Sequence, residues 1–391
     1  MNYVLFDESR RKNLLPLTFM RPVADIRFGI LTIREKWELH LKTKTSTLTE
    51  SYLAEKFPLI KEKSNIIING AICPNDELVA EINQLEPGFA LIKGDTILAM
   101  SMNEEDFKVQ SNAVQEIETN VNCLEINNTW DIYAKNALAI EDDFKKITAN
   151  RKSAPIPAHC IAFAPQNIFI EEGAQLFATT LNATDGPIYI GKNAIIMEGS
   201  NLRGPIAICE NSTVKMGAKL YGGTTVGPHS KVGGEINNSV IFGYSNKAHD
   251  GFMGHSVIAE WCNLGADTNT SNLKNTYDNV KLWNYADETF VETNQQFCGL
   301  IMGDHTKCGI NTMFNTGTVV GVSANIFGAG FQRNFISSFK WGGVAGFQTF
   351  NPTKAIEIAK GMYKRRNLEF DDIEIRLMEN VYNLTHNYRR M

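Results

Sequence analysis

A six-residue repeat constrains the fold of this chain more than any other feature. Aliphatic residues recur at every sixth position at Ile190, Ile196, Leu202, Ile208, Val214, Leu220, Val226 and Val232. Four residues after each comes a second set, mostly small: Ala194, Ser200, Ile206, Ser212, Ala218, Thr224, Ser230 and Ile236. A helix repeats near 3.6 residues and a strand at 2, so this period fits neither alone. It predicts a β-solenoid whose aliphatic residues stack inward.

The repeat extends beyond this stretch, with two interruptions. It begins near Ile168, slips after Ile236 and resumes at Phe252, which the period would place in the interior. A polar segment, residues 269–297, interrupts it again before it returns at Met302. Insertions in solenoids usually carry function while the regular coils form a scaffold, so we expect functional residues at the interruptions.

The two ends of the chain do not follow the six-residue period. Residues 1–150 alternate between short apolar runs and segments of helical spacing, which predicts an α/β layer domain. We expect helices at residues 26–39, 76–85 and 130–140. The boundaries that follow are a linker at 151–165, the β-helix at 166–337 and a helical tail at 338–391.

Composition excludes several classes of protein. The 391 residues are 43% hydrophobic and 21% charged with a net charge of −5, which predicts a globular protein without general affinity for nucleic acid. No apolar run approaches the length of a membrane span, and the first residues lack the layout of a signal peptide. Seven cysteines without a CxxC pair indicate reduced thiols and a cytoplasmic location.

One passage between coils has polar and aromatic residues in a specific order. Ser245 and His249 are followed by Phe252-Met253-Gly254, then by Asn263-Leu264-Gly265-Ala266-Asp267-Thr268 and Asn272, with Cys308-Gly309-Ile310-Asn311 later. This passage resembles the bifunctional glucosamine-1-phosphate acetyltransferase / N-acetylglucosamine-1-phosphate uridylyltransferase family, and most closely its archaeal type. The resemblance covers roughly residues 165–335, and residues 1–30 more loosely.

The resemblance implies a left-handed parallel β-helix that transfers an acetyl group from acetyl-CoA to an amino-sugar phosphate. His249 matches the catalytic base, which must take a proton from the amine as the new bond forms. Asn272 matches an amide near the thioester oxyanion, which needs positioned donors. Such β-helices assemble as homotrimers with the acyl site between neighbours.

The family's binding residues are matched in part. Asn263 matches a contact to the sugar, and Ala266 and Gly328 match contacts to acetyl-CoA. Lys219 lies where bacterial members bind the sugar phosphate through an Arg, and Asn237 replaces a usual Lys. Three lysines could compensate for the lost charge: Lys247, Lys274 and Lys281.

Phe252 stands where the family usually has a Tyr, which removes a hydroxyl near the sugar. A zinc site of three histidines is an alternative interpretation of the same segment. His249 and His255 are six residues apart, which puts them on different faces of a solenoid, and His229 or His305 would have to complete the site.

The N-terminal domain resembles sugar nucleotidylyltransferases in outline only. Their Gly-rich loop is replaced here by residues 7–10, which include two acids that would repel a triphosphate. Arg10, Lys12 and Arg21 are the candidate nucleotide-binding residues, and Asp95 is the candidate ligand for Mg²⁺ if UTP is a substrate.

Two other functions fit the sequence. The chain could be a sugar-nucleotide pyrophosphorylase whose β-helix only builds the oligomer, or a non-catalytic protein that binds sugar nucleotides. The intact motif around His249 favours the acetyltransferase over both.

Overall fold

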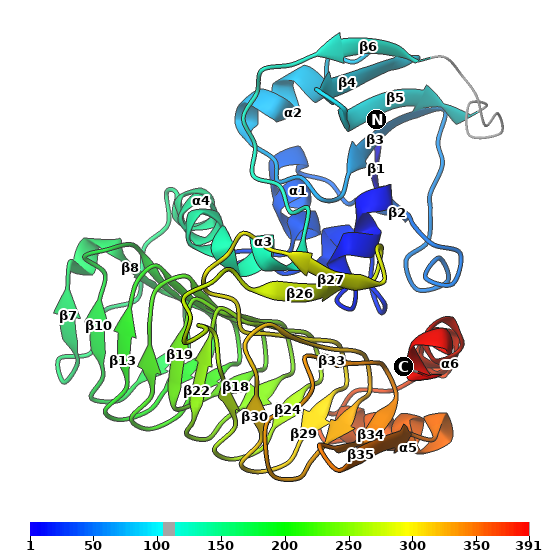
Figure 1. Cartoon of the computed structure of the whole chain (residues 1–391). Coiled ribbons are helices and arrows are strands. Elements are labelled where there is room, and N and C mark those ends of the chain that lie inside the picture. The colour runs from blue at the N-terminus through cyan, green and yellow to red at the C-terminus, as the bar shows by residue number, and fades with distance from the viewer. Residues whose placement is uncertain (105–113, 391) are drawn as a thin grey trace.

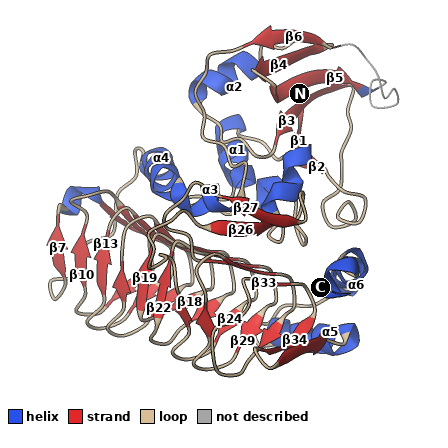
Figure 2. Ribbon diagram, viewed as in Figure 1, coloured by secondary structure: helices blue, strands red, loops and turns tan. Residues whose placement is uncertain are grey.

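The computed structural model describes residues 1–104 and 114–390, which form an α/β domain seated on a long parallel β-solenoid (Figure 1). The sheet and helices of the first part lie above the solenoid, and two helices lie beside its C-terminal end (Figure 2). The α/β domain, the parallel solenoid and the C-terminal helices expected from the sequence are therefore confirmed. The left hand of the β-helix stays a prediction from the resemblance.

The N-terminal domain is a six-stranded mixed sheet of order β2-β1-β3-β5-β4-β6. Its strands are β1 (Asn2–Phe6), β2 (Ser46–Leu48), β3 (Ser64–Asn69), β4 (Phe89–Lys93), β5 (Thr96–Asn103) and β6 (Gln115–Glu118). Its helices are η1 (Ser9–Leu14), η2 (Val23–Asp25), α1 (Ile33–Leu41), α2 (Asp76–Ile82), α3 (Thr129–Ala134) and α4 (Asn136–Thr148). β1, β2 and β3 are parallel, whereas β5 runs antiparallel to both of its neighbours.

The first long helix begins later than its apolar spacing predicts. Helical spacing from residue 26 suggested a helix over 26–39, but α1 starts at Ile33 behind the capping box of Thr32 and Glu35. Gly29 explains the delay, because its φ of 85° is left-handed and a Cβ there would lie 2.7 Å from the carbonyl oxygen of Ala139. The chain therefore turns against α4 before the helix can begin.

The solenoid is a three-sided prism, and each coil contributes one short strand to each face. The first face contains β7 (Ile161–Phe163), β10 (Thr180–Asn182), β13 (Asn201–Arg203), β16 (Lys219–Leu220), β19 (Glu235–Asn237), β22 (Phe252–Gly254), β25 (Asn269–Thr270) and β30 (Met313–Phe314). The second contains β8 (Ile168–Ile170), β11 (Ile188–Ile190), β14 (Ile206–Ile208), β17 (Thr224–Val226), β20 (Val240–Ile241), β23 (Val257–Ile258), β28 (Leu300–Met302), β31 (Thr318–Val320) and β33 (Phe335–Ile336).

The third face closes the prism and ends in an antiparallel hairpin. It contains β9 (Gln175–Leu176), β12 (Ile195–Ile196), β15 (Thr213–Val214), β18 (Lys231–Val232), β21 (Asn246–Lys247), β24 (Asn263–Leu264), β29 (Lys307–Cys308), β32 (Asn325–Ile326), β34 (Lys340–Gly343) and β35 (Gly346–Thr349). Every pairing within the three faces, apart from that hairpin, is parallel.

The six-residue pattern correctly identifies the interior of the prism. Both sets of eight residues are buried, each with at most 2% of its surface exposed. The small residues of the second set include hydroxyls that bond backbone carbonyls inside the coil, such as Ser200 to Lys215 at 2.8 Å and Ser230 to Phe242 at 2.7 Å. The serine hydroxyls of this set are therefore satisfied without water, whereas the hydroxyl of Thr224 has no partner among the described residues.

The prediction that Phe252 faces the interior of the prism is wrong. Met253 is the fully buried residue of strand β22, and Phe252 faces outward beside Glu235. The next inward residue after Met253 is Ile258, five residues on rather than six, so a period of six counted back from Ile258 misses the inward position by one residue. Phe252 is consequently on the outer surface of the first face, where a substrate contact is possible.

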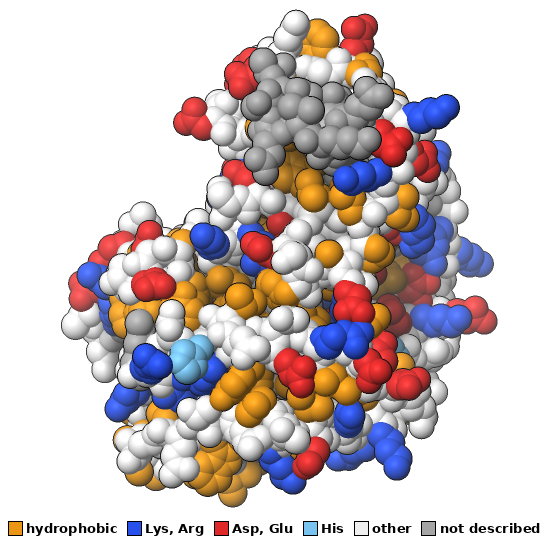
Figure 3. Space-filling view, turned by 90° about the vertical axis from the view of Figure 1, so that its right-hand side faces the viewer, with side chains coloured by type: hydrophobic (Ala, Val, Ile, Leu, Met, Phe, Trp, Pro, Cys, Tyr) orange, Lys and Arg blue, Asp and Glu red, His pale blue; other side chains and the backbone are white. Residues whose placement is uncertain are grey.

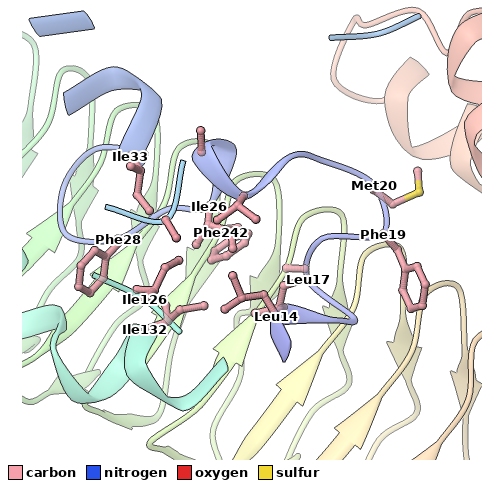
Figure 4. Packing of buried hydrophobic residues seen from close by; sticks show 14 of the residues in the cluster. Leu14, Leu17, Phe19, Met20, Ile26, Phe28, Ile33, Ile126, Ile132 and Phe242 are labelled. Carbon is pink, nitrogen blue, oxygen red and sulfur yellow. The ribbon is translucent and has the colours of Figure 1, made fainter. Parts of the chain in front are cut away.

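The N-terminal domain packs on the second face. Outward residues of that face, among them Val240, Val257 and Ile301, belong to the same buried cluster as Leu14 and Ile26. Figure 4 shows Phe242 of the solenoid among side chains of the N-terminal segment. The insertion at 269–297 forms the hairpin β26 (Lys281–Asn284) and β27 (Thr289–Glu292), which lies beside this junction (Figure 1). One continuous core thus joins the two parts.

The C-terminal helices pack along the corner between the second and third faces. They are α5 (Pro352–Lys364) and α6 (Asp372–Leu384), followed by η5 (Asn387–Arg390). Tyr363 of α5 stacks on Trp261 with ring centroids 4.0 Å apart, and Trp261 stacks on Tyr244 at 4.2 Å. Ion pairs from Glu374 and Arg376 connect α6 to the N-terminal domain.

Two surface properties bear on function. No helix in the described parts of the chain is long and apolar enough to cross a membrane. On the face shown in Figure 3, Lys and Arg side chains are interspersed with Asp and Glu, so this view contains no broad basic surface among the described residues. Such a surface is what nucleic-acid binding requires.

Candidate functional site

His249 lies on the turn between the third face and the first. Its side chain is exposed, and the turn is supported from inside the prism by Lys247. The Lys247 ammonium donates to the carbonyl oxygens of His249, at 2.6 Å, and Asp250, at 3.0 Å. Burial lowers the pKa of Lys247 to about 8. A lysine at a position that is aliphatic in other coils therefore fixes the backbone that carries His249.

The register of the third face aligns His249 with the predicted acetyl-CoA contacts. Asn246 pairs with Asn263, Asn263 with Lys307, and Lys307 with Asn325. The residues three positions after these four form one column along the axis of the prism, here called the His249 corner: His249, Ala266, Ile310 and Gly328.

Asn272 follows strand β25 and lies at the edge of the first face opposite to His249. Its Nδ2 donates to Nδ1 of His255 at 2.8 Å. A Cβ at Gly254 would lie 2.7 Å from Cζ of Phe252 and closer still to Nδ2 of Asn272, so the ring and the amide meet above Gly254. The structure thus brings together Phe252 and Asn272, and adds His255 to them.

His255 is a residue that the sequence motif did not single out as functional. Its ring stacks on Phe297 at 5.1 Å and meets the edge of Tyr133, from the N-terminal domain, at 5.7 Å. Burial lowers its pKa to about 4, so the ring is neutral near pH 7 and Nδ1 can accept from Asn272. The sequence analysis considered His255 only as a zinc ligand.

His249 and Asn272 are not in contact. They flank opposite ends of β22, and three strand residues span roughly 10 Å at about 3.3 Å per residue. Two groups at this separation can act on one ligand only if it lies along the first face. Lys219 and Asn237 are on this face, exposed and half-buried respectively.

A cavity of about 450 Å³ borders the His249 corner on the third face, here called the third-face pocket. Asn263, the predicted sugar contact, lines it together with Ala248, which immediately precedes His249. The C-terminal end of α5 forms its outer wall through Arg365 and Arg366. None of these α5 residues was a candidate in the sequence.

The three lysines expected to compensate for lost charge are already engaged. Lys247 points into the prism, as described above, and cannot reach a ligand on the outside. Lys274 donates to the Asn279 carbonyl at 2.6 Å, and Lys281 pairs with Glu292 across the β26–β27 hairpin at 3.1 Å. The expectation for Lys247 is therefore wrong, because position 247 pairs with Val232 of the preceding coil and faces inward like it.

The nucleotide-binding candidates of the N-terminal domain lie in different surroundings. Arg10 pairs with Glu8 and Glu125 in the loop after β1, and Lys12 is exposed. Arg21 is buried at the solenoid junction, where it bonds Asp304 and, at 3.1 Å, Glu260. The structure does not bring these three cations to one site.

The described residues contain no ready magnesium site. Asp95 is exposed at the turn between β4 and β5, and no group of three or more His, Cys, Asp or Glu in the described chain could hold a metal. The histidines of the zinc alternative lie on separate corners: His255 bonds Asn272, while His229 and His305 belong to the ring stack around Trp261.

Comparisons with known proteins support this architecture. Residues 3–152 match the sequence model of a family described as sugar nucleotidyl transferase. The "Bifunctional protein GlmU" of Methanococcus vannielii is 27% identical over 281 residues, covering 69% of this chain and 57% of that protein. The protein of the same name from Methanococcus aeolicus is 36% identical over 87 residues, 22% of this chain and 20% of that protein.

The chain is therefore related to the archaeal bifunctional GlmU proteins, although it spans only 57% of the length of the first of them. The crystal structure of an Arabidopsis UDP-N-acetylglucosamine acyltransferase aligns with 60% of this chain and 94% of that chain, at 16% identity. Its TM-score of 0.28 is too low to support an inference about fold or function.

Proposed function

We propose that this relative of the archaeal bifunctional GlmU proteins transfers an acetyl group from acetyl-CoA to an amino-sugar 1-phosphate. Glucosamine-1-phosphate is the expected acceptor. The observation that carries the proposal is the register that aligns His249, Ala266 and Gly328 on one corner beside a cavity. The proposed base and the two proposed contacts to acetyl-CoA therefore lie in one row parallel to the axis of the prism.

The proposed reaction uses His249 as the base. The amine attacks the thioester carbon while His249 accepts its proton, a C–N bond replaces the C–S bond, and the proton passes to the leaving thiolate. The products are an amide and free CoA. Asn272 is the proposed donor to the oxyanion. Because its Nδ2 is bonded to His255 in the free chain, the amide must exchange that contact for the oxyanion.

We also propose a homotrimer in which the His249 corner faces a neighbouring subunit. Met216 and Ile310 lie on the same corner and are 67% and 70% exposed, which favours burial by another copy. Light scattering after size exclusion should give three times the 43.6 kDa chain mass. The seven free thiols suit a reducing cytoplasm, the location we propose.

The match over residues 3–152 favours a second activity, uridylyl transfer from UTP to N-acetylglucosamine-1-phosphate with release of pyrophosphate. The loop after β1 opposes it, because Asp7 bonds Arg11 and Glu8 bonds Arg10 where the transferases have a Gly-rich loop. The alternative is that this domain serves only to pack on the solenoid.

Two assays on the full chain separate these functions. Acetyl-CoA and glucosamine-1-phosphate are followed by thiol release, and UTP with N-acetylglucosamine-1-phosphate by pyrophosphate. We expect thiol release that disappears in His249→Ala and persists in Asp95→Ala. Pyrophosphate without thiol release would indicate a pyrophosphorylase with a structural β-helix, and neither product a non-catalytic sugar-nucleotide-binding protein.

A further inference from the structure

The third-face pocket has an unbalanced charge. Four cations line it, Lys231 and Lys307 from the third face and Arg365 and Arg366 from the end of α5, and no carboxylate does. Within the described chain none of the four forms an ion pair, and only Lys307 has a hydrogen bond, to the carbonyl of His305 at 2.8 Å. Like charges gathered around one pocket repel one another, and an anion bound among them would reduce that repulsion.

Both lysines of the pocket have a lowered pKa. The pKa of Lys231 is lowered by burial and then by Arg366, Lys215 and Arg365, all of them cations. Burial lowers the pKa of Lys307 to about 8. Glu260, an acid close to Tyr244, pairs with Arg21 outside the pocket. A bound anion would relieve the repulsion between Lys231 and the two arginines.

A neutral side chain in the same pocket also lacks a partner. Asn246 lines the third-face pocket, and neither its buried Oδ1 nor its amide nitrogen has a hydrogen-bond partner among residues 1–104 and 114–390. Buried polar atoms in folded proteins are almost always paired. An anion in the pocket can accept a hydrogen bond from the Asn246 amide nitrogen.

The walls of the pocket limit its contents further. Tyr244, part of the ring stack with Trp261, closes one side, and Ala248 borders the other, next to His249. A volume of about 450 Å³ is in the range of small-molecule sites and holds a sugar phosphate or a nucleoside phosphate. A ligand here would lie against the turn that carries the proposed base.

We propose that the third-face pocket binds the phosphate of a phosphate ester through Arg365, Arg366, Lys231 and Lys307. This reassigns phosphate recognition from Lys219 and Asn237, on the first face, to α5 and the third face. Two esters have this chemistry, the amino-sugar phosphate and the phosphorylated ribose of CoA. The choice between them rests on the proposed function, whereas the phosphate site does not.

Basic residues also favour helix C-termini without any ligand, through the helix dipole. The charge alone therefore does not distinguish a site from a stable helix end, and the test uses matched variants on the same helix. Arg365→Gln/Arg366→Gln removes two pocket cations. Lys360→Gln/Lys364→Gln removes two exposed cations of α5 that do not line the pocket.

Calorimetric titration of the full chain at low salt uses three probes: inorganic phosphate, glucosamine-1-phosphate and adenosine 3′,5′-bisphosphate. We expect at least one ester to bind more tightly than inorganic phosphate. Its affinity should fall at least tenfold in Arg365→Gln/Arg366→Gln and in Asn246→Asp, which adds a negative charge at constant size, and less than twofold in Lys360→Gln/Lys364→Gln.

The outcomes separate the sources and the two proposals. If Arg365→Gln/Arg366→Gln lowers the affinity for glucosamine-1-phosphate alone, the pocket binds the acceptor. If it lowers the affinity for adenosine 3′,5′-bisphosphate alone, the pocket binds CoA. Equal affinity in all variants, or equal loss in the lysine control, overturns the site. Phosphate binding that depends on Arg365 and Arg366 without thiol release would refute the acetyltransferase proposal and leave the site standing.

Discussion

Arg21 gives the sharpest test of how the two parts of the chain are joined. Its side chain and that of Asp304 are 6% and 1% exposed, and the residues are 283 positions apart in sequence. Burial alone would lower the pKa of Arg21, but the charges of Asp304 and Glu260 outweigh it and raise that pKa. The guanidinium is therefore charged and held by the solenoid, which conflicts with its expected role in nucleotide binding.

Replacing Arg21 by Met should destabilise the protein strongly. It leaves Asp304 buried with only the backbone amide of Glu260, at 3.0 Å, as its donor. Removing one partner of a buried ion pair typically costs about 3–5 kcal/mol. With a urea m-value of about 3 kcal/mol/M, the unfolding midpoint should fall by roughly 1–1.7 M.

Urea unfolding followed by circular dichroism measures this shift. Arg376→Met is the matched control, because Arg376 also reaches the N-terminal domain but pairs with Glu55 at the surface, where both side chains are about half exposed. We expect no measurable change in the control. The double variant Arg21→Met/Asp304→Leu should recover much of the loss, since no lone buried charge remains.

The reasoning is refuted if Arg21→Met unfolds at the wild-type urea concentration. An unchanged midpoint together with loss of pyrophosphate release from UTP would instead assign Arg21 to nucleotide binding. A double variant less stable than either single variant would also contradict the ion-pair explanation, because the two losses would then be independent.

Three further predictions follow from particular contacts. Lys247→Met should lower the turnover number for thiol release at least tenfold with little change in KM, because the turn that carries His249 loses its support; an unchanged turnover number would exclude this role. Trp261→Ala, which removes the ring between Tyr244 and Tyr363, should cost about 3–5 kcal/mol in urea unfolding. The free energy of unfolding should fall by at most roughly 3 kcal/mol as the pH drops from about 6.5 towards 4. His255 has a pKa of about 4 in the folded protein and about 6.5 in the unfolded chain, so in this range the unfolded chain binds the proton and the folded protein does not. His255→Leu should make this part of the stability curve flat.

The period of six could be interpreted from the sequence because it is a local property of the backbone. Each coil repeats the same three short strands, so a residue's position in the period fixes whether it faces the interior, as for Ile196 or Ser200. The pattern failed at Phe252, where two inward residues, Met253 and Ile258, are five rather than six residues apart. His249 was identified by its motif, which is also local.

Contacts between distant segments leave no periodic mark and came only from the tertiary structure. The bond between Asn272 and His255, the burial of Arg21 against Asp304 and the closure of the third-face pocket by Arg366 each join separate elements. Their formation depends on which face of the prism the N-terminal domain and α5 cover, and that choice is made by packing of apolar surfaces rather than by any residue's neighbours in sequence. The sequence by itself therefore determined the prism and its interior, whereas the tertiary structure decided which surfaces remain open to a ligand.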